Sequence, residues 1–423
     1  MFFQTNCFLS ISKIWDNITL KFIIKGYLLL PENTVNRAFS PNSLDFNQLT
    51  KEVSELDDWL NQGFQCDQVL LREQIQSLWS GYGEIVKFQL LPDKTEPDLV
   101  FSVIAKWVKA PLQVNHPRGW QSDRAHNRKL TSYQVELNTY KLLNQLKALT
   151  YSPLSVRVPY CFYGFHQETQ QQQILLLEDL DHAGFPVRYS QLTPQQTLPC
   201  LQWLAEFHAY FLCDTNNPNL LAEHLASALD LDNLTSYTQN LSHPLGVWPI
   251  GSYWHLATRS DEWQAMADSR LKKHAAKLDK ALNQLRFQTL IHGDAKVANF
   301  CFSKPDMNGE VEVAALDFQY TGQGCGMKDL AYFLGSCLTE AQCEQECLAL
   351  LDQYFVYLKT ALLQLNSTLD VSALEAEWRF AFELAWADFQ RFLEGWSPNH
   401  KKNTAFSRAL TVSALNKLGS MPI

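Results

Sequence analysis

The residues with the clearest chemistry follow two apolar runs in the second half of the chain. The first run ends in His292-Gly293-Asp294, and Asn299 follows the aspartate by five residues. The second run ends in Asp317, eighteen residues past Asn299. Phosphoryl transfer needs one carboxylate that takes a proton from an acceptor hydroxyl, and a second carboxylate that holds Mg2+ together with a neutral oxygen ligand. Asp294, Asp317 and Asn299 supply these three groups, while His292 is expected to pack and hydrogen-bond the catalytic loop.

Each part of this pattern also has an ordinary interpretation. His-Gly-Asp often marks a turn, and an aspartate after a strand often caps a helix. A metal-dependent hydrolase using His292 and Asp294 would need further ligands at metal spacing, which His255, His274 and His400 do not offer. The order of the two motifs, each after an apolar run, favours phosphoryl transfer.

Three upstream features match the other half of such a site. Lys106 directly follows an apolar triplet, where its ammonium could reach phosphate oxygens. Lys109 competes with Lys106, which we favour because it follows the triplet directly. Glu136 lies in an expected helix and could pair with Lys106, or face solvent. Gly81 and Gly83 form a tight turn whose backbone could approach phosphates, although Gly-x-Gly also marks an ordinary hairpin.

The hydrophobic period predicts strands first and helices afterwards. This order indicates an α+β fold in two lobes, with a ligand in the cleft between them. We expect an N-terminal extension over residues 1–45, an N-lobe over 46–180 and a helical C-lobe over 181–423. In the N-lobe we expect two helices between Phe46 and Leu78, then a strand, turn and strand over Trp79–Leu91 and a strand over Leu99–Val108. A polar loop around Asn115–Arg128, a helix over Ser132–Leu149 and strands over Pro159–Phe165 and Ile174–Leu177 should follow. From Thr193 onward the chain should be mostly helical, with a strand-like block at Thr289–Phe318.

Composition restricts the class of protein. The chain has 423 residues, 46% of them apolar, which suffices for a packed core and argues against disorder. Its formal charge of −9 argues against nucleic-acid or membrane-surface partners. No apolar run approaches the ~18 residues of a membrane span, and the N-terminus lacks the basic start of a signal peptide. The ten cysteines have no Cys-x-x-Cys pair, so we expect reduced thiols, no zinc site and a cytoplasmic protein.

The motifs together resemble the kinase-like small-molecule phosphotransferases. This group includes aminoglycoside phosphotransferases, choline kinases and the ecdysteroid-kinase-like (CHK kinase-like) branch, which is the most similar. The resemblance covers about residues 70–400 and implies a protein-kinase-like fold that uses ATP and Mg2+ to phosphorylate a small-molecule alcohol. It rests on Leu177-Glu178-Asp179-Leu180 with Gly184-Phe185, His292-Gly293-Asp294 with Asn299, Asp317-Phe318-Gln319, and Asp329-Leu330-Ala331-Tyr332-Phe333-Leu334.

The resemblance also implies a role for each matching residue. Asp294 corresponds to the catalytic base, Asn299 and Asp317 to the magnesium ligands, and Lys106 with its partner Glu136 to the phosphate anchor.

Two further segments match the family with less detail. The hinge segment, with Leu177, Glu178 and Leu180, corresponds to the backbone that hydrogen-bonds adenine, and Asp329 to an acid that braces the catalytic loop. Gln319 stands where protein kinases have glycine, and the glycine turn lacks their third glycine.

The acceptor side is expected near the aromatic-rich C-terminal region. Phe382, Trp386, Phe389 and Phe392 recur at helical spacing, so we expect them in the core. Asp388 and Arg391 fall between these positions and are the better candidates to bind the acceptor, which could be a caged quaternary amine or a flat alcohol such as a steroid. A second aromatic segment, Trp248–Arg259, has no position fixed by the sequence. The leading hypothesis is an ATP-dependent kinase of a small alcohol, and the alternative is a nucleotide-binding pseudokinase that acts as a scaffold.

Overall fold

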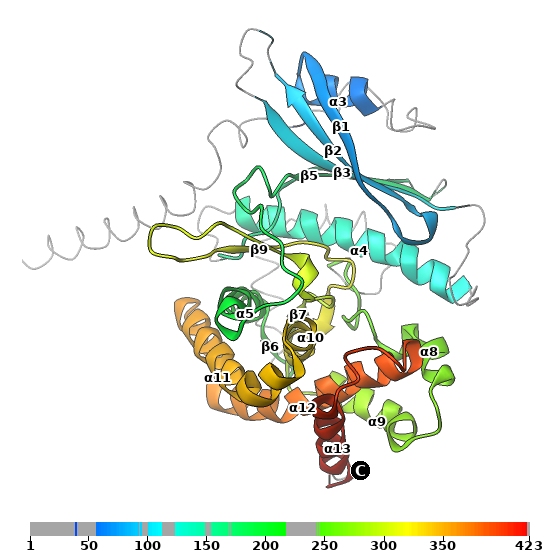
Figure 1. Cartoon of the computed structure of the whole chain (residues 1–423), viewed down its shortest axis with the longest axis vertical. Coiled ribbons are helices and arrows are strands. Elements are labelled where there is room, and N and C mark those ends of the chain that lie inside the picture. Colours follow the sequence, from blue (N-terminus) through cyan, green and yellow to red (C-terminus); the bar gives the residue numbers. More distant parts are fainter. Residues whose placement is uncertain are drawn as a thin grey trace, which may run out of the picture.

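The structure is a computed structural model that describes Phe39 and residues 56–92, 94, 100–111, 123–148, 154–167, 169, 171–216, 243 and 245–420. It has two lobes, with a β-sheet in the first and helices in the second (Figure 1). Apart from Phe39, the expected N-terminal extension lies outside the described residues. Phe39 packs on Trp59 with ring centroids 4.6 Å apart.

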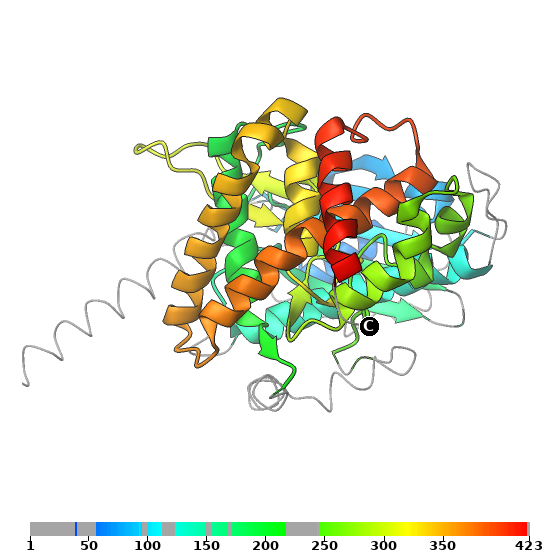
Figure 2. The ribbon, with the colours of Figure 1, turned by 90° about the horizontal axis from the view of Figure 1, so that it is seen from below.

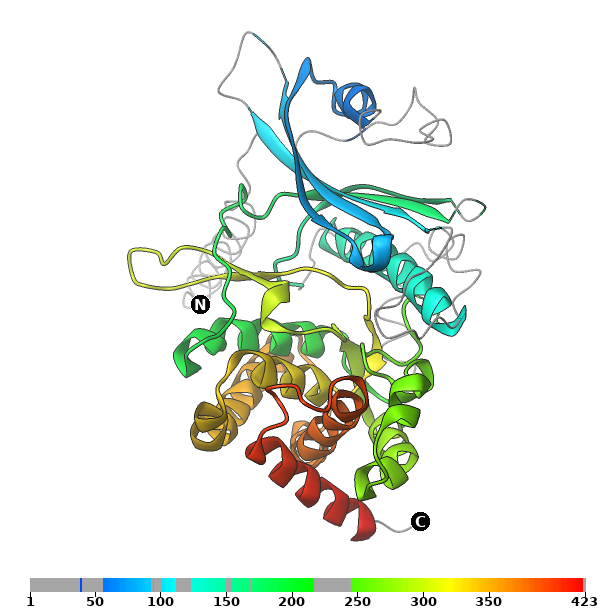
Figure 3. The ribbon, with the colours of Figure 1, turned by 45° about the vertical axis from the view of Figure 1, so that its right-hand side comes forward.

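One antiparallel sheet forms the N-lobe. Its strands are ordered β1-β2-β3-β5-β4, and the long helix α4 lies between this sheet and the helical lobe (Figure 3). The elements of this lobe are α3 (Leu56–Phe64), β1 (Gln68–Ser77), the 3-10 turn η3 (Trp79–Gly81), β2 (Gly83–Leu91), β3 (Phe101–Lys109), α4 (Asp123–Ala148), β4 (Cys161–Gln167) and β5 (Gln172–Glu178).

Alternation along β3 decides which way its lysines point. Val103, Ala105 and Trp107 pack in the cluster formed with α3 on one face of the sheet. Because successive side chains of a strand point to opposite faces, Lys106 points to the other face, toward α4. Lys109 has the parity of Trp107 and is exposed at the strand end. The structure therefore separates the two candidates and places Lys106 toward the cleft.

Three expected elements of the N-lobe were wrong. The strand expected to begin at Trp79 is the 3-10 turn η3, because the chain already turns there between β1 and β2. The segment with Val69 and Ile75 is not a helix but the edge strand β1, paired with β2 and interrupted by two register shifts. As an edge strand it is exposed over most of its length, so it has no alternating burial that a sequence pattern would show. Helix α4 begins at Asp123, in the segment expected to be a polar loop. Its first turns present polar side chains such as Arg124 and Asn127 to solvent, so their sequence resembles that of a loop.

The C-lobe consists of helices packed around short strands that carry the catalytic segment. Helices α11, α12 and α13 lie across its underside (Figure 2). Its elements are α5 (Pro194–Tyr210), β6 (Cys213–Asp214), η6 (Leu256–Thr258), α8 (Ser260–Ala265), α9 (Arg270–Asn283), β7 (Phe287–Ile291), η7 (Val297–Asn299), β8 (Phe300–Phe302), β9 (Val313–Ala315), β10 (Gly322–Gly324), α10 (Met327–Cys337), α11 (Glu340–Gln364), α12 (Val371–Trp396) and α13 (Ala405–Ser420).

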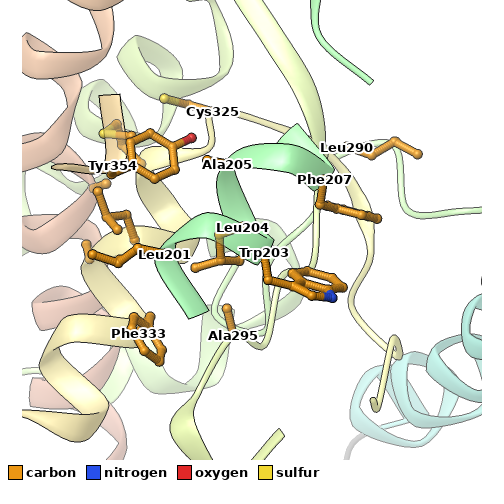
Figure 4. Close-up of a cluster of buried hydrophobic side chains, with 14 of the residues drawn as sticks. Leu201, Trp203, Leu204, Ala205, Phe207, Leu290, Ala295, Cys325, Phe333 and Tyr354 are labelled. Atoms are coloured by element: carbon orange, nitrogen blue, oxygen red, sulfur yellow. The ribbon is translucent and has the colours of Figure 1, made fainter. Parts of the chain in front are cut away.

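The core of this lobe lies directly beneath the segment that follows β7. Trp203 and Phe207 on α5 stack with centroids 5.1 Å apart, in the same cluster as Ala295 and Phe333 (Figure 4). Because a close-packed interior has few voids, the segment after β7 cannot shift without moving these side chains, so the cluster fixes its position. Among the helices that the structure describes, none is long and apolar enough to cross a membrane. The cysteines within the described ranges are free thiols.

Candidate active site

A cavity of about 1400 Å³ opens between the two lobes. It is lined by the turn before β2, by Lys106 of β3, by the first half of α4, by the segment after β5, by the segments after β7 and β9, and by the C-terminal end of α12. Asp294, Asn299, Asp317, Lys106 and Glu136, which are far apart in the sequence, all line it. The sequence motifs therefore meet in one place.

Asp294 presents one free carboxylate oxygen at this cavity. The residue is 4% exposed, and its Oδ2 accepts hydrogen bonds from Lys296 Nζ at 2.8 Å and Asn299 Nδ2 at 3.1 Å. Its buried Oδ1 has no hydrogen-bond partner in the described protein. Burial raises the pKa of Asp294, and the nearby Asp317 raises it further, while Lys296 opposes the shift. A carboxylate with a raised pKa and an unpaired oxygen is suited to accept a proton.

The backbone before Asp294 is fixed by a buried acid, Asp329. Its Oδ2 accepts the N–H of His292 at 2.6 Å and Nε2 of His208 at 3.1 Å, and its Oδ1 accepts the N–H of Gly293 at 2.9 Å. Three donors, two on the segment after β7 and one on α5, thus converge on one carboxylate, which holds the catalytic segment in place.

His292 is a structural residue in this arrangement. It is fully buried, its Nδ1 accepts the N–H of Asp294 at 3.3 Å, and its Nε2 lies 3.0 Å from the carbonyl oxygen of Leu316. An acceptor at Nδ1 and a donor at Nε2 define a neutral imidazole. The ring packs on Phe318 at 4.7 Å, so His292 links the segments after β7 and β9 and does not line the cavity.

Asp317 has an unusual backbone conformation and is ionised. Its φ of 68° lies in the left-handed region, and its N–H donates to the Tyr140 hydroxyl at 3.3 Å. Such a conformation is strained for a residue other than glycine and often marks a functional position. Burial alone would raise the pKa of Asp317, but Lys106, Lys296 and Lys129 together hold it below its ordinary value. The side chain is therefore ionised near neutral pH.

Asp317 and Asn299 fit a divalent metal. Asp317 Oδ1 is buried and has no hydrogen-bond partner in the part of the chain that the structure describes, with Lys106 Nζ 3.8 Å away. Asn299 Nδ2 donates to the carbonyl oxygen of Asp294 at 2.8 Å, which leaves the amide oxygen as the ligand atom. Within the described ranges no group of three or more His, Cys, Asp or Glu is arranged to hold a metal by itself. Two protein oxygens, supplemented by water and substrate phosphates, are typical of Mg2+ sites.

Lys106 and Glu136 form a buried ion pair across the cleft face of the sheet. Lys106 Nζ lies 2.9 Å from Oε1 and 2.7 Å from Oε2 of Glu136, and 3.8 Å from Asp317 Oδ1. Burial alone would lower the pKa of Lys106, but Glu136 and Asp317 raise it above its ordinary value. The ammonium is thus charged and positioned between α4 and Asp317.

The glycine turn has a structural reason for each glycine. Gly81 has a φ of 76°, and Gly83 has a φ of 127° with no room for a side chain, since a Cβ there would lie 2.0 Å from the carbonyl oxygen of Trp107. The cavity is lined by Ser80 and Tyr82, and neither glycine is among its lining residues. Phosphate contacts by Gly81 and Gly83 stay a prediction.

The hinge segment after β5 lines the cavity through Leu177, Glu178 and Leu180. The Glu178 carboxylate binds Arg157 Nη2 at 2.7 Å and the N–H of Tyr160 at 3.0 Å, so its side chain anchors the hinge. The N–H of Glu178 is also used, because it donates to the Tyr160 carbonyl oxygen at 2.8 Å. Adenine contacts by this segment stay a prediction.

Asp388 and Arg391, predicted to bind the acceptor, do not reach the cavity. Both are fully buried, and Arg391 Nε donates to Asp388 Oδ1 at 2.9 Å. Asp388 Oδ2 also accepts Trp254 Nε1 at 3.0 Å, and Arg391 Nη2 donates to the Trp254 carbonyl oxygen at 2.7 Å. The correction has a physical reason: the two charges satisfy each other inside the lobe and fix the segment that carries Trp254.

The aromatic side of the cavity combines residues that the sequence did not bring together. We call it the acceptor wall, and it consists of Tyr253, Arg259, Tyr320, Tyr332, Phe389, Phe392 and Trp396. The four aromatic residues predicted to be core, Phe382, Trp386, Phe389 and Phe392, are all buried, and Phe389 and Phe392 also line the cavity from their own buried cluster. The segment that the sequence could not place, Trp248–Arg259, supplies Tyr253 and Arg259.

The comparisons with solved structures return small-molecule kinases at low similarity. The choline kinase LicA from Streptococcus pneumoniae shares 12% identity, covering 89% of this chain and 99% of that chain, with a TM-score of 0.36. The GDP complex of aminoglycoside 2'-phosphotransferase-IIIa shares 12% identity, covering 85% and 95%, with a TM-score of 0.37. A microcompartment-associated aminopropanol kinase shares 12% identity, covering 82% and 89%, with a TM-score of 0.33. No curated protein matches the sequence.

The chain is assigned to a family by a match over its sequence. The sequence pattern of the ecdysteroid kinase-like family matches residues 106–367, which is more than half of the chain and includes Lys106, Asp294 and Asp317. The predicted α+β fold, with a strand-rich first lobe and a helical second lobe, is confirmed by the structure, and the resemblance to the ecdysteroid-kinase-like branch is confirmed by this match. The chain therefore belongs to the ecdysteroid kinase-like family.

Proposed function

We propose that this protein transfers the γ-phosphoryl group of ATP to a hydroxyl group of a small-molecule alcohol. One observation carries the proposal: Asp294 and Asp317 each hold a buried carboxylate oxygen that has no hydrogen-bond partner among the described residues, and both line the cavity that the Lys106–Glu136 pair also lines. Buried carboxylate oxygens without partners are costly unless a ligand completes them. An acceptor hydroxyl at Asp294 and a magnesium-bound nucleotide at Asp317 would do so.

Each residue has a separate task in this mechanism. Asp294 Oδ1 accepts the hydrogen bond of the acceptor hydroxyl and orients its oxygen toward the γ-phosphorus. It takes the proton as the new P–O bond forms, while the bond between the γ-phosphorus and the bridging oxygen of ATP breaks and ADP leaves with that oxygen. The raised pKa of Asp294 suits this transfer, because the carboxylate is a better proton acceptor than an exposed one. Lys106 binds phosphate oxygens and is held in place by Glu136. Mg2+ on Asp317 and Asn299 would neutralise charge on the phosphates.

Nucleotide binding provides the first test. A ligand that binds the folded state stabilises it by RT ln(1 + [L]/Kd), about 2.7 kcal/mol at 100 Kd. We expect ATP to raise the melting temperature of the wild-type chain mainly when Mg2+ is present. Asp317→Asn should lose this magnesium-dependent part, whereas the control Asp306→Asn, on an exposed turn, should keep it. No stabilisation at millimolar ATP, or an equal magnesium effect in Asp317→Asn, would refute the proposed site.

A further inference from the structure

The charges that line the cavity are distributed unevenly. The carboxylates lie toward the hinge and the catalytic segment: Glu136, Glu178, Asp179, Asp181, Asp294 and Asp317. Lys106, Lys296 and Arg188 are paired with carboxylates of this group, and Lys129 also acts on Asp317. Further cations line the cavity where the first turns of α4 approach the acceptor wall, at Arg128 and Arg259, with Lys402 beyond α12. Within the described part of the chain, no carboxylate forms an ion pair with Arg128, Lys129 or Lys402. A cationic acceptor would meet unfavourable charge on this side.

Arg259 is built into the acceptor wall as a fixed cation. Its guanidinium carbon lies 4.1 Å from the centre of the Tyr253 ring and 5.2 Å from that of Phe392. Its Nε donates to the Tyr253 carbonyl oxygen at 2.9 Å, and its Nη1 donates to Glu262 Oε1 at 2.9 Å. The residue is 4% exposed, so an anion at this position would meet a preoriented and largely desolvated guanidinium.

Arg128 adds a second guanidinium beside the first. Its Nη1 donates to the carbonyl oxygen of Thr258, the residue before Arg259, at 2.6 Å. Burial lowers the pKa of Arg128, and the charge of Arg259 lowers it further. Among the described residues, Glu262 is the carboxylate whose charge acts on both arginines, and its Oε1 already accepts from Arg259. One carboxylate for two guanidinium groups leaves an excess positive charge between the buried Arg259 and the half-buried Arg128, which is unfavourable until an anion compensates it.

Two lysines extend the positive surface on either side. Lys129 Nζ lies 4.7 Å from the centre of the Tyr133 ring and donates to Gln319 Oε1 at 3.0 Å. Lys402 Nζ lies 5.9 Å from the centre of the Tyr332 ring on the acceptor wall. Burial lowers the pKa of each of these lysines to about 8. The aromatic rings between the cations offer flat apolar surface for a ring skeleton.

From this arrangement we propose that the acceptor is an aromatic or fused-ring alcohol that also carries an acidic group, and that Arg128 and Arg259 bind this group. The inference rests on the proposed phosphotransferase function and adds the class of its substrate. A carboxylate, sulfate or phosphate would fit, because each offers the oxygen pair that guanidinium groups recognise. The same arrangement argues against the quaternary amine that the sequence left open as an acceptor.

Matched probes that differ only in charge test this proposal. The probes are a hydroxymethyl-naphthoate, its methyl ester and the corresponding hydroxymethyl-naphthyl-trimethylammonium ion, with the naphthyl sulfate and phosphate as further anions. With the full chain, ATP and Mg2+, ADP release gives kcat and KM for each probe. Thermal unfolding with a non-hydrolysable ATP analogue gives binding without turnover. We expect the carboxylate to have the highest kcat/KM and the tightest binding, and the trimethylammonium probe the lowest.

Variants identify the residues responsible. Arg128→Gln should raise KM and weaken binding of the carboxylate about tenfold to a hundredfold, the range for a lost charge-assisted hydrogen bond, with little change for the ester. Arg259→Lys, which keeps a charge for Glu262, should reduce the same carboxylate-to-ester ratio. Arg124→Gln, one turn before Arg128 and exposed, is the matched control and should leave the ratio unchanged.

The outcomes separate this inference from the proposed function. If ATP gives no magnesium-dependent stabilisation, the proposed function fails whatever the probes do. If ATP binds but the ester or the ammonium probe is bound or turned over as well as the carboxylate, the inference is wrong and the proposed function stands. An unchanged carboxylate-to-ester ratio in Arg128→Gln, or no saturable binding of any anionic probe, also overturns it. Preference for the sulfate or phosphate over the carboxylate supports the inference and identifies the acidic group.

Discussion

Replacing Asp329 by Asn should destabilise the protein strongly through the catalytic segment. The carboxylate accepts three hydrogen bonds, from His292 N–H, Gly293 N–H and His208 Nε2, and it is fully buried. An asparagine keeps one oxygen. If that oxygen stays with His292 and His208, the amide NH2 faces the N–H of Gly293, and two buried donors are left opposed.

The magnitude follows from these contacts. Losing a hydrogen bond to a charged group removes about 1.5–3 kcal/mol, and a buried donor without a partner adds about 1–3 kcal/mol. We therefore expect Asp329→Asn to lower the free energy of unfolding by about 2.5–6 kcal/mol, a large part of the ~5–15 kcal/mol of a typical protein. The measurement is urea unfolding followed by tryptophan fluorescence, with phosphoryl transfer measured under conditions where the variant stays folded.

Asp306 provides a control with similar chemistry and different burial. Its Oδ1 accepts the N–H groups of Asn308 and Glu310, both at 2.8 Å, but on an exposed turn where water can replace the lost partner. Asp306→Asn should change the free energy of unfolding by less than about 1 kcal/mol. If Asp329→Asn is no more destabilising than Asp306→Asn, burial of the three-donor contact does not stabilise the catalytic segment as argued here.

Three further predictions follow from the site. Lys106→Ala should weaken binding of MgATP in a calorimetric titration, whereas Lys109→Ala, on the opposite face of β3, should not; equal effects would contradict the assignment. In a pH–rate profile, the rate of transfer should fall as the pH is lowered through the pKa of Asp294, because its carboxylate is the base. Since burial raises this pKa, the fall should occur at a higher pH than an ordinary aspartate would give. Gly83→Ala should lower the free energy of unfolding in urea by several kcal/mol, because its Cβ would lie 2.0 Å from a carbonyl oxygen of β3. Gly81→Ala has open space around its Cβ and should lower the free energy of unfolding by only about 1 kcal/mol, owing to its positive φ. Equal losses of stability would show that β2 and β3 can move apart.

The residues around the phosphoryl-transfer centre could be predicted because local sequence determines them. Asp294 and Asp317 each end an apolar run, and such runs form the buried strands β7 and β9 that fix their ends in space. Lys106 could be chosen by its place after an apolar triplet, and strand alternation on β3 explains why that choice agrees with the structure.

The acceptor wall could not be predicted because tertiary packing determines it. Helical spacing shows that Phe389 and Phe392 are turned inward, but not that a cavity lies there. Asp388 and Arg391 looked like pocket residues because they interrupt the stripe, yet a buried charge can be satisfied by a neighbour three residues away, as here. Arg128 and Arg259 carry no motif, and only the contact between α4 and η6 brings them together.

The most direct measurement of the central claim compares wild-type protein with Asp294→Asn after incubation with ATP, Mg2+ and the panel of naphthyl alcohols. Phosphomonoester products are detected by phosphorus NMR, and MgATP affinity is measured on the same samples. We predict a phosphomonoester and an equal amount of ADP with the wild type, and no ester with Asp294→Asn, whose MgATP affinity should stay close to that of the wild type. Parallel loss of MgATP binding would contradict the role of Asp294 as base. Ester formation by Asp294→Asn at the wild-type rate would contradict it as well, whereas a wild type that binds MgATP but phosphorylates none of these alcohols would overturn the inferred class of acceptor.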